Sequence, residues 1–133
     1  IVFMPEIDPN QMGGTMRLGS RQTLLKRYDG SPSMAERIYS KGKGIWERHR
    51  HRYEVNPDYI ERLEKSGLHF TGVDERGERM EIVELAEAEH PFFFATQFHP
   101  EFKTRPEAPS LPFAAFIRAC CTHGRSRGSK IST

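Results

Sequence analysis

The chain has 133 residues, of which 36% are hydrophobic and 29% are charged. That length suits one domain, and the composition is too apolar for a wholly disordered chain. With 20 Lys and Arg against 18 Asp and Glu, the formal net charge is only +2, which does not by itself indicate a nucleic-acid partner.

Two further features narrow the class of protein. No apolar run approaches the roughly 18 residues that a membrane-spanning helix needs, so we expect no membrane partner. The two cysteines, Cys120 and Cys121, are adjacent, which strains a mutual disulfide, and no CxxC motif is present. We therefore expect a reducing, cytoplasmic compartment. Because the chain starts with Ile1 and not with methionine, we also expect a piece of a longer protein.

The first third of the chain contains signals for a loop, a strand and a helix. Proline and glycine residues within 5–16 predict a loop. Residues 17–27 follow as a predicted strand. Ser33 and Glu36 have the spacing of a capping box, which predicts that a helix starts there and runs to about Ser40.

The middle of the chain combines extended segments with one helix. Residues 45–55 alternate with a period of two, which predicts a strand, and its many polar side chains argue against a role in filling the core. Residues 57–66 start with proline and carry apolar residues on one face, as a helix does. Residues 68–73 and 79–85 flank an Asp-Glu-Arg-Gly turn and form a predicted hairpin.

The last third supplies a strand, a helix and a tail. Residues 92–98 are a continuous apolar run, which is typical of a strand in the middle of a parallel α/β sheet. Residues 111–121 form a predicted helix whose apolar face is made by Phe113, Phe116, Ile117 and Cys120. We therefore place residues 1–122 in one domain portion, and the Ser, Gly, Arg and Lys residues of 123–133 predict a flexible basic tail.

The apolar run leads directly into Gln97-Phe98-His99-Pro100-Glu101. In an extended chain His99 and Glu101 point to the same side. The carboxylate can then accept the Nδ1 proton of the histidine and leave Nε2 free as a base. The same spacing also fits a surface histidine beside a solvated glutamate, and spacing alone does not decide between the two.

The string QFHPEF, between an apolar strand and a proline-rich stretch, resembles the end of class I glutamine amidotransferase domains. The strings QMGGTMRLG at 11–19, ERHRHRYEVN at 47–56 and RMEIVE at 79–84 are similar to the CTP synthase branch of that family. The similarity covers roughly residues 4–121. It implies an α/β, flavodoxin-like, three-layer fold, of which this chain holds the C-terminal half only.

The resemblance implies roles for three residues. His99 and Glu101 match the family's catalytic His and Glu, which serve a cysteine thiolate that attacks the side-chain amide of glutamine. Arg52 matches a residue that contacts glutamine, where a guanidinium can hold the α-carboxylate with two hydrogen bonds. The family's cysteine lies upstream in a Gly-x-Cys-x-Gly elbow that is absent here. Cys120 and Cys121 follow His99, and we expect them to be small core or flanking thiols.

For a whole enzyme, the resemblance implies synthesis of CTP from UTP, ATP and glutamine in de novo pyrimidine nucleotide biosynthesis. ATP and Mg²⁺ would bind a synthetase domain of the same chain, with GTP as an activator, and the enzyme would be a homotetramer. The glycine-rich string at 12–19 would face that synthetase domain. The present segment would hold no cofactor and no metal.

Other functions are compatible with the residues. The chain could be a non-catalytic regulatory module that keeps the amidotransferase scaffold without a nucleophile. Residues 48–53, with arginines, histidines and a tyrosine, have types that bind nucleic acid, although Glu47 and Glu54 can pair with these arginines. His49 and His51 are a candidate zinc pair, but no further ligand with suitable spacing is visible. We therefore expect neither nucleic acid nor a metal.

Overall fold

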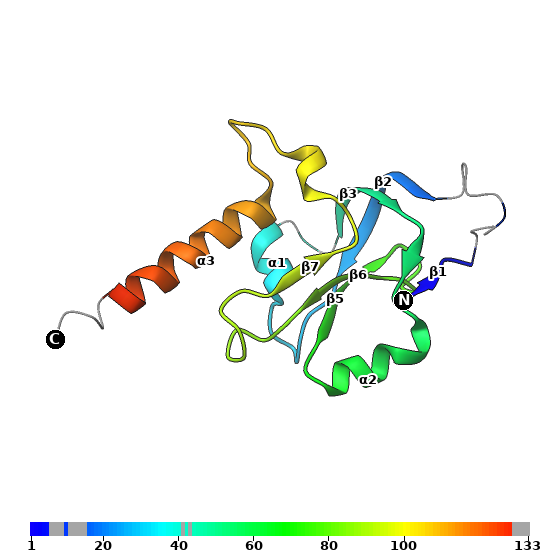
Figure 1. Cartoon of the computed structure of the whole chain (residues 1–133), viewed down its shortest axis with the longest axis horizontal. Helices are drawn as coiled ribbons and strands as arrows, with labels where there is room; N and C mark the ends of the chain where they lie inside the picture. The colour runs from blue at the N-terminus through cyan, green and yellow to red at the C-terminus, as the bar shows by residue number, and fades with distance from the viewer. Residues whose placement is uncertain (6–9, 11–15, 41, 43, 129–133) are drawn as a thin grey trace.

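The computed structural model describes residues 1–5, 10, 16–40, 42 and 44–128. Its main sheet has five strands in the order β3-β2-β5-β6-β7 (Figure 1). Their bounds are Arg17–Leu25 for β2, Gly44–His51 for β3, His69–Asp74 for β5, Met80–Glu84 for β6 and Phe94–Thr96 for β7. Every pair of neighbouring strands is antiparallel. The expectation of half a parallel sheet is therefore wrong.

The predicted hairpin of β5 and β6 is one local cause of this arrangement. Gly77 has φ +77°, a left-handed conformation that glycine adopts without a side-chain clash. Backbone bonds join Gly77 N to Asp74 O and Asp74 N to Arg79 O. The buried Asp74 carboxylate also accepts from the Glu78 and Arg79 amides at 2.8 and 3.0 Å. So short a turn can only return the chain antiparallel.

Helices cover both faces of the sheet, which confirms the three-layer arrangement. One buried cluster involves α1 (Met34–Tyr39) and is formed by Leu25, Ala35, Tyr39, Ile45, Ile82 and Phe98. A second cluster of Phe70, Val73 and Met80 packs against Ile60 and Leu63 of α2 (Ile60–Lys65), which follows the short helix η1 (Pro57–Tyr59). Leu24 and Leu25 are neighbours on β2 but belong to different clusters, so the two clusters lie on opposite faces.

The predicted capping box is present at the start of α1. Ser33 Oγ accepts from Glu36 N at 3.2 Å, and Ser33 N donates to Glu36 Oε2 at 3.3 Å. A second carboxylate caps the same helix from the sheet. Glu84, at the end of β6, accepts from Met34 N at 2.7 Å and from Ala35 N at 3.1 Å. Because Glu84 is only 4% exposed, these bonds fix α1 on the sheet from within the protein.

The sheet curls until β3, at one edge, approaches β6 and the segment that follows β7. β3 and β6 are separated by two strands, yet His49 Nδ1 lies 3.3 Å from Glu81 Oε2. Beyond β7, His99 N donates to Arg48 O of β3 at 2.9 Å. Adjacent strands are about 4.8 Å apart, so these contacts require strong curvature, in line with the natural twist of strands. The curvature brings the candidate residues of β3 next to those that follow β7.

The apolar run 92–98 does not occupy the middle of the sheet. β7 contains only its central residues and pairs with β6 alone. Phe93 and Ala95 are exposed, whereas Phe92, Phe94 and Thr96 are partly buried. This alternation is typical of a strand with one covered face. The predicted central position is therefore wrong, because a run of aromatic residues does not distinguish an edge strand from a central one.

The last helix, α3 (Leu111–Gly128), is longer than predicted. It continues through residues 123–128, so that part of the expected flexible tail is helical. The segment contains no proline, and each of its glycines, at 124 and 128, costs a helix only about 1 kcal/mol. Residues 129–133 of the expected tail lie outside the described residues.

The apolar face predicted for α3 is largely uncovered. Phe113, Phe116 and Ile117 are 43%, 49% and 58% exposed. In Figure 1 the helix extends away from the sheet, with its C-terminal part farthest from the other elements. The predicted helix and its apolar face are therefore confirmed, and most of that face is exposed.

Two short strands complete the fold. β1 (Val2–Phe3) pairs with β4 (Tyr53–Glu54) in a separate two-stranded sheet. The predicted strand 45–55 is thus two strands, β3 and β4, which are interrupted at Arg52. The glycine-rich string lies partly in 11–15, outside the described residues, and its end opens β2. No helix in the described ranges has both the length and the apolar character for crossing a membrane.

Candidate functional site

The predicted pair of His99 and Glu101 forms a hydrogen bond. A tight helical turn, η2 (Pro100–Lys103), follows His99 and brings Glu101 Oε1 to 2.8 Å from His99 Nδ1. A carboxylate only accepts, so Nδ1 carries the proton and Nε2 is left available as a base. The pair forms through a turn and not through the extended chain that we expected. The two side chains are 36% and 50% exposed, so a second molecule can reach them.

Local contacts set the charge of Glu101 and the orientation of the His99 ring. The backbone amide of Glu101, and then the bond from His99, lower the pKa of the Glu101 carboxyl. Glu101 is therefore ionised at neutral pH and can stabilise a positive charge on the imidazole. The His99 ring also stacks on Phe102, with ring centroids 4.7 Å apart. These contacts hold the ring in one orientation.

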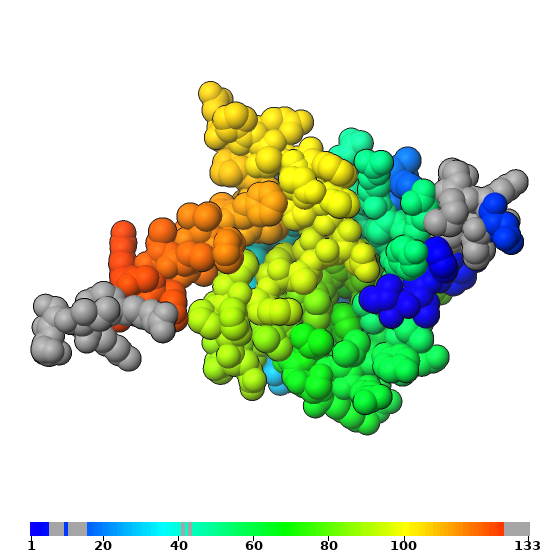
Figure 2. Space-filling view, viewed as in Figure 1, coloured from blue at the N-terminus to red at the C-terminus, as the bar shows by residue number. Residues whose placement is uncertain are grey.

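β3 anchors both ends of η2. His99 N donates to Arg48 O at 2.9 Å. Lys103 Nζ donates to Trp46 O and lies 3.4 Å from Glu47 Oε2. Glu47 is only 6% exposed; burial raises its pKa, and the charge of Lys103 opposes that shift. In the space-filling view the yellow segment around residue 100 lies on the surface of the molecule (Figure 2).

Arg52, the predicted substrate contact, lies where the chain leaves the main sheet. Side chains at positions 46, 48 and 50 are exposed, whereas Glu54 is buried. The alternation of exposed and buried positions therefore reverses around Arg52, whose carbonyl accepts from Met4 N at 3.0 Å. Burial is the main factor that lowers the pKa of His51, and the charge of His99 contributes. The corner at Arg52 thus lies in the electrostatic neighbourhood of His99.

A buried polar cluster, which the sequence did not reveal, lies behind this corner. It consists of Arg17 on β2, His49 and His51 on β3, and Glu81 on β6. Arg17 Nε is 3.2 Å from Glu81 Oε1, and His49 Nδ1 is 3.3 Å from Glu81 Oε2. His49 and Glu81 are each 1% exposed. The expectation that the polar side chains of β3 have little role in the core is therefore wrong.

One arrangement of protons is consistent with the bonds that His51 makes to Tyr53 and His49. Tyr53 O can only accept, so His51 Nδ1, at 2.9 Å, must donate to it. Burial lowers the pKa of His51, and burial followed by the charge of Arg17 lowers that of His49 to about 3. Both rings are therefore neutral near pH 7. His51 Nε2 then accepts from His49 Nδ1, at 3.1 Å.

The cluster also meets the distance criterion for a metal site. Donor atoms of His49, His51 and Glu81 lie within 4.8 Å of one another, so the structure supplies a third ligand that the sequence did not suggest. A divalent ion there would have to displace the bond between the two histidines. It would also face the Arg17 guanidinium across the same carboxylate, where two cations repel. We therefore interpret this cluster as a hydrogen-bonded and ion-paired support.

Neither cysteine is placed to act on the pair. Cys120 and Cys121 are both exposed on α3, so of the two expected positions, core or flank, neither thiol occupies a core position. They lie near the middle of α3 (Leu111–Gly128), and among the described residues neither forms a hydrogen bond with His99. A cysteine that reacts with the help of His99 would have to come from outside these 133 residues.

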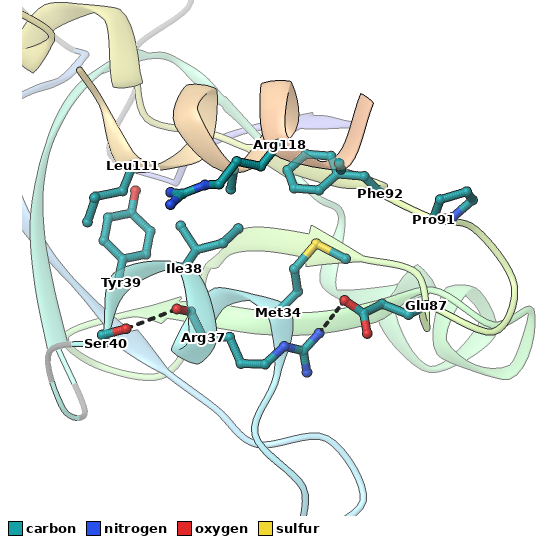
Figure 3. Close-up of a pocket in the computed structure, with 12 residues that line it drawn as sticks. Met34, Arg37, Ile38, Tyr39, Ser40, Glu87, Pro91, Phe92, Leu111 and Arg118 are labelled. Atoms are coloured by element: carbon teal, nitrogen blue, oxygen red, sulfur yellow. Dashed lines mark hydrogen bonds and ion pairs between the residues drawn. The ribbon is translucent and has the colours of Figure 1, made fainter. Parts of the chain in front are cut away.

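A groove between α1 and α3 is separate from the pair. It encloses about 630 Å³ and lies between side chains of α1, such as Ile38, and of α3, such as Leu111 and Arg118 (Figure 3). Arg37 and Glu87, 2.8 Å apart, pair at one end of it. No residue of η2 lines it, and its chemistry adds nothing to the site described above.

Comparison with known proteins places this geometry in a family. Residues 4–119 match the family model described as glutamine amidotransferase class-I. The chain is 50% identical over 119 residues to the CTP synthase of Dictyostelium discoideum, covering 90% of this chain and 21% of that protein. It is 53% identical over 116 residues to the CTP synthase of Archaeoglobus fulgidus, covering 87% of this chain and 20% of that protein.

A solved structure shows the same fold. The glutaminase domain of Trypanosoma brucei CTPS with bound acivicin superimposes with a TM-score of 0.74 at 39% sequence identity. The match covers 86% of this chain and 43% of that one. The chain spans about a fifth of the length of the curated relatives that it matches.

Proposed function

The chain belongs to the class I glutamine amidotransferase family, and on that basis we propose that it supplies the histidine and glutamate of the glutaminase site of a CTP synthase. The hydrogen bond between His99 Nδ1 and Glu101 Oε1, at 2.8 Å, carries the proposal. It leaves His99 Nε2 as a base on an accessible surface, next to a carboxylate that is ionised at neutral pH.

This geometry suits proton transfer to and from a cysteine. His99 Nε2 would accept the thiol proton, and the thiolate would attack the side-chain amide carbon of glutamine. The imidazolium, stabilised by Glu101, would then protonate the departing nitrogen, which leaves as ammonia. Water, deprotonated by His99, would hydrolyse the glutamyl thioester, and the histidine would return the proton to the departing thiol. Glutamate and the free cysteine are the products of this step.

Arg52 is proposed as the group that binds the α-carboxylate of glutamine. The guanidinium is suited to two parallel hydrogen bonds with a carboxylate. Its position next to the end of β3 supports the role, because β3 also binds the catalytic segment through the bond from His99 N to Arg48 O at 2.9 Å. β3 would then lead directly into the substrate contact and also hold the turn with the catalytic pair.

The complete activity needs parts outside this chain. The cysteine nucleophile, the ATP, Mg²⁺ and UTP sites and the GTP response would belong to other segments of a CTP synthase. The ammonia released here would convert UTP to CTP there. The proposal includes a cytoplasmic homotetramer as the working enzyme, as expected from the sequence resemblance.

A chimeric enzyme tests the proposal. Residues 4–123 of this chain would replace the corresponding segment of the Dictyostelium discoideum CTP synthase, which is 50% identical over 119 residues. We expect CTP formation with glutamine or with ammonia as nitrogen donor. His99→Ala should lower the glutamine-dependent rate by about 10² to 10⁴-fold and spare the ammonia-dependent rate, whereas His123→Ala, at an exposed position on α3, should change neither.

Two results would contradict the proposal. A His99→Ala chimera with undiminished glutamine-dependent activity would remove His99 from the catalytic role. A parent gene that encodes no Gly-x-Cys-x-Gly segment upstream would favour the non-catalytic module instead, an alternative that the similarity to CTP synthases does not favour.

A further inference from the structure

The backbone around Arg52 is held by a side chain that spans it. His51 precedes Arg52, and its ring donates from Nδ1 to the carbonyl of Tyr53, which follows Arg52, at 2.9 Å. This hydrogen bond thus closes a small turn that contains Arg52 between His51 and Tyr53. Met4 N holds the Arg52 carbonyl itself at 3.0 Å. Together these bonds fix the corner between β3 and β4.

The His51 ring is itself fixed from the interior. Its Nε2 accepts from His49 Nδ1 at 3.1 Å, and His49 is only 1% exposed. His49 in turn lies 3.3 Å from Glu81, which Arg17 holds at 3.2 Å. A chain of buried polar contacts therefore runs from β2 and β6 through β3 to the corner.

The far side of the corner is also anchored. Glu54, 6% exposed, accepts from Arg79 Nε at 2.9 Å, and Arg79 Nη1 lies 3.6 Å from Asp74. The residues that flank Arg52 are thus tied to the sheet on both sides. The bond from His51 is the contact that joins the two sides directly.

We propose that His51 is a positioning residue for Arg52, and that its bond to the Tyr53 carbonyl aims the guanidinium at the α-carboxylate of glutamine. The inference rests on the proposed function, since that function gives Arg52 its ligand. His51 would then influence the affinity for glutamine without contacting the substrate itself.

The role predicts a specific kinetic pattern. Arg52 would bind a group of glutamine that does not react, so its contact is equally strong in the ground state and the transition state. Weakening such a contact raises KM and leaves kcat unchanged. A residue that only supports the fold would instead reduce the fraction of active enzyme, and so lower kcat at constant KM.

Two substitutions separate the donor from the shape of the ring. In the chimera, His51→Leu removes the donor, whereas His51→Asn places an amide N–H near the position of Nδ1. We expect KM for glutamine to rise about tenfold or more in His51→Leu, with kcat and ammonia-dependent CTP formation within about twofold of wild type. His51→Asn should restore KM to within about threefold of wild type. His90→Leu is the matched control, because the His90 ring also bonds to the backbone two residues further on. In that case Nδ1 of the ring accepts from Phe92 N at 3.2 Å.

A measurement on the unmodified 133-residue chain tests the geometry without any substitution. Nitrogen-15 NMR distinguishes a histidine that is protonated at Nδ1 from one that is protonated at Nε2. We expect the Nδ1-protonated, neutral form for His51 at pH 7. The Nε2-protonated form, or an unchanged KM in a folded His51→Leu chimera that hydrolyses glutamine, would overturn the inference alone. A wild-type chimera with no glutamine-dependent activity would overturn the proposed function and this inference together.

Discussion

His49 of β3 lies 3.3 Å from Glu81 of β6, although β2 and β5 separate their strands in the sheet. The contact exists because the sheet curls, and it places a histidine and a carboxylate in the protein interior. Burying charged groups is costly unless they are paired, and Arg17 supplies the pairing charge at 3.2 Å from Glu81. The interior next to the candidate site is therefore polar and sensitive to pH.

Glu81→Gln is expected to alter the pH dependence of stability. Burial raises the pKa of Glu81 from 4.5 to about 7, an effect that Arg17 opposes. Between these pH values the folded chain holds a proton that the unfolded chain has released. The unfolding free energy of the wild type should therefore fall relative to Glu81→Gln as the pH rises from about 4.5 to about 7, by at most about 3 kcal/mol.

Urea unfolding at pH 5 and pH 8, followed by circular dichroism, measures this difference. His49 has the opposite effect: because its pKa is lowered from 6.5 to about 3, the unfolding free energy rises with pH between these two values. His49 is present in both proteins, so the difference between wild type and variant cancels most of its contribution. An equal difference between the two proteins at both pH values would show that Glu81 titrates normally.

Glu84→Ala should be strongly destabilising. The substitution leaves Met34 N and Ala35 N at the start of α1 without their acceptor, together with the Thr71 hydroxyl, which donates to Glu84 at 2.8 Å. We expect a loss of about 3 kcal/mol in unfolding free energy, against about 1 kcal/mol for Thr71→Val, which removes one bond only. Equal losses in urea titrations of the two variants would argue against a capping role for Glu84.

Lys103→Met should slow catalysis in the chimera. Lys103 ties the end of η2 to Trp46 O and Glu47, so its loss would let Glu101 move relative to His99. We expect a decrease of about tenfold in glutamine-dependent kcat, with KM within about twofold, because small misplacements of catalytic groups are costly. Lys65→Met, which removes an exposed pair with Glu61, is the control. Equal kinetics for the two variants would mean that η2 keeps its place without Lys103.

The 133-residue chain alone should release no glutamate from glutamine. Its two thiols are exposed near the middle of α3 and form no hydrogen bond with His99 among the described residues, whereas general-base help requires hydrogen-bond distance. In the chimera, Cys120→Ser and Cys121→Ser should each leave the glutamine-dependent rate within about twofold of wild type. Glutamate production by the purified chain, measured with glutamate dehydrogenase, would refute this expectation.

Local signals in the sequence predicted local structure well. The capping box of Ser33 and Glu36, the hairpin turn at Gly77 and the pairing of His99 with Glu101 each depend on residues within a few positions of one another. Turn and cap chemistry is encoded at that range. The resemblance to the amidotransferase family added the fold class, which the family match and the solved glutaminase domain confirm.

Features that depend on distant residues were not predictable in the same way. His49 has the alternation of a solvated strand, and its partner Glu81 comes from a different hairpin, so only the curvature of the sheet reveals that both are buried. The exposure of Phe113 and Ile117 could not be predicted either. Their spacing defines an apolar face correctly, but a pattern on one helix does not say whether another element covers it.

The pairing of β1 with β4 has a practical consequence for handling the protein. Met4 N holds the Arg52 carbonyl, and Val2 and Phe3 pair with Glu54 and Tyr53. The amino terminus therefore sits close to the proposed substrate contact, whereas the last helical turn of α3 lies far from it (Figure 1). An affinity tag fused before Ile1 would crowd that contact, and a tag placed after Thr133 is the safer choice for NMR work on the isolated chain.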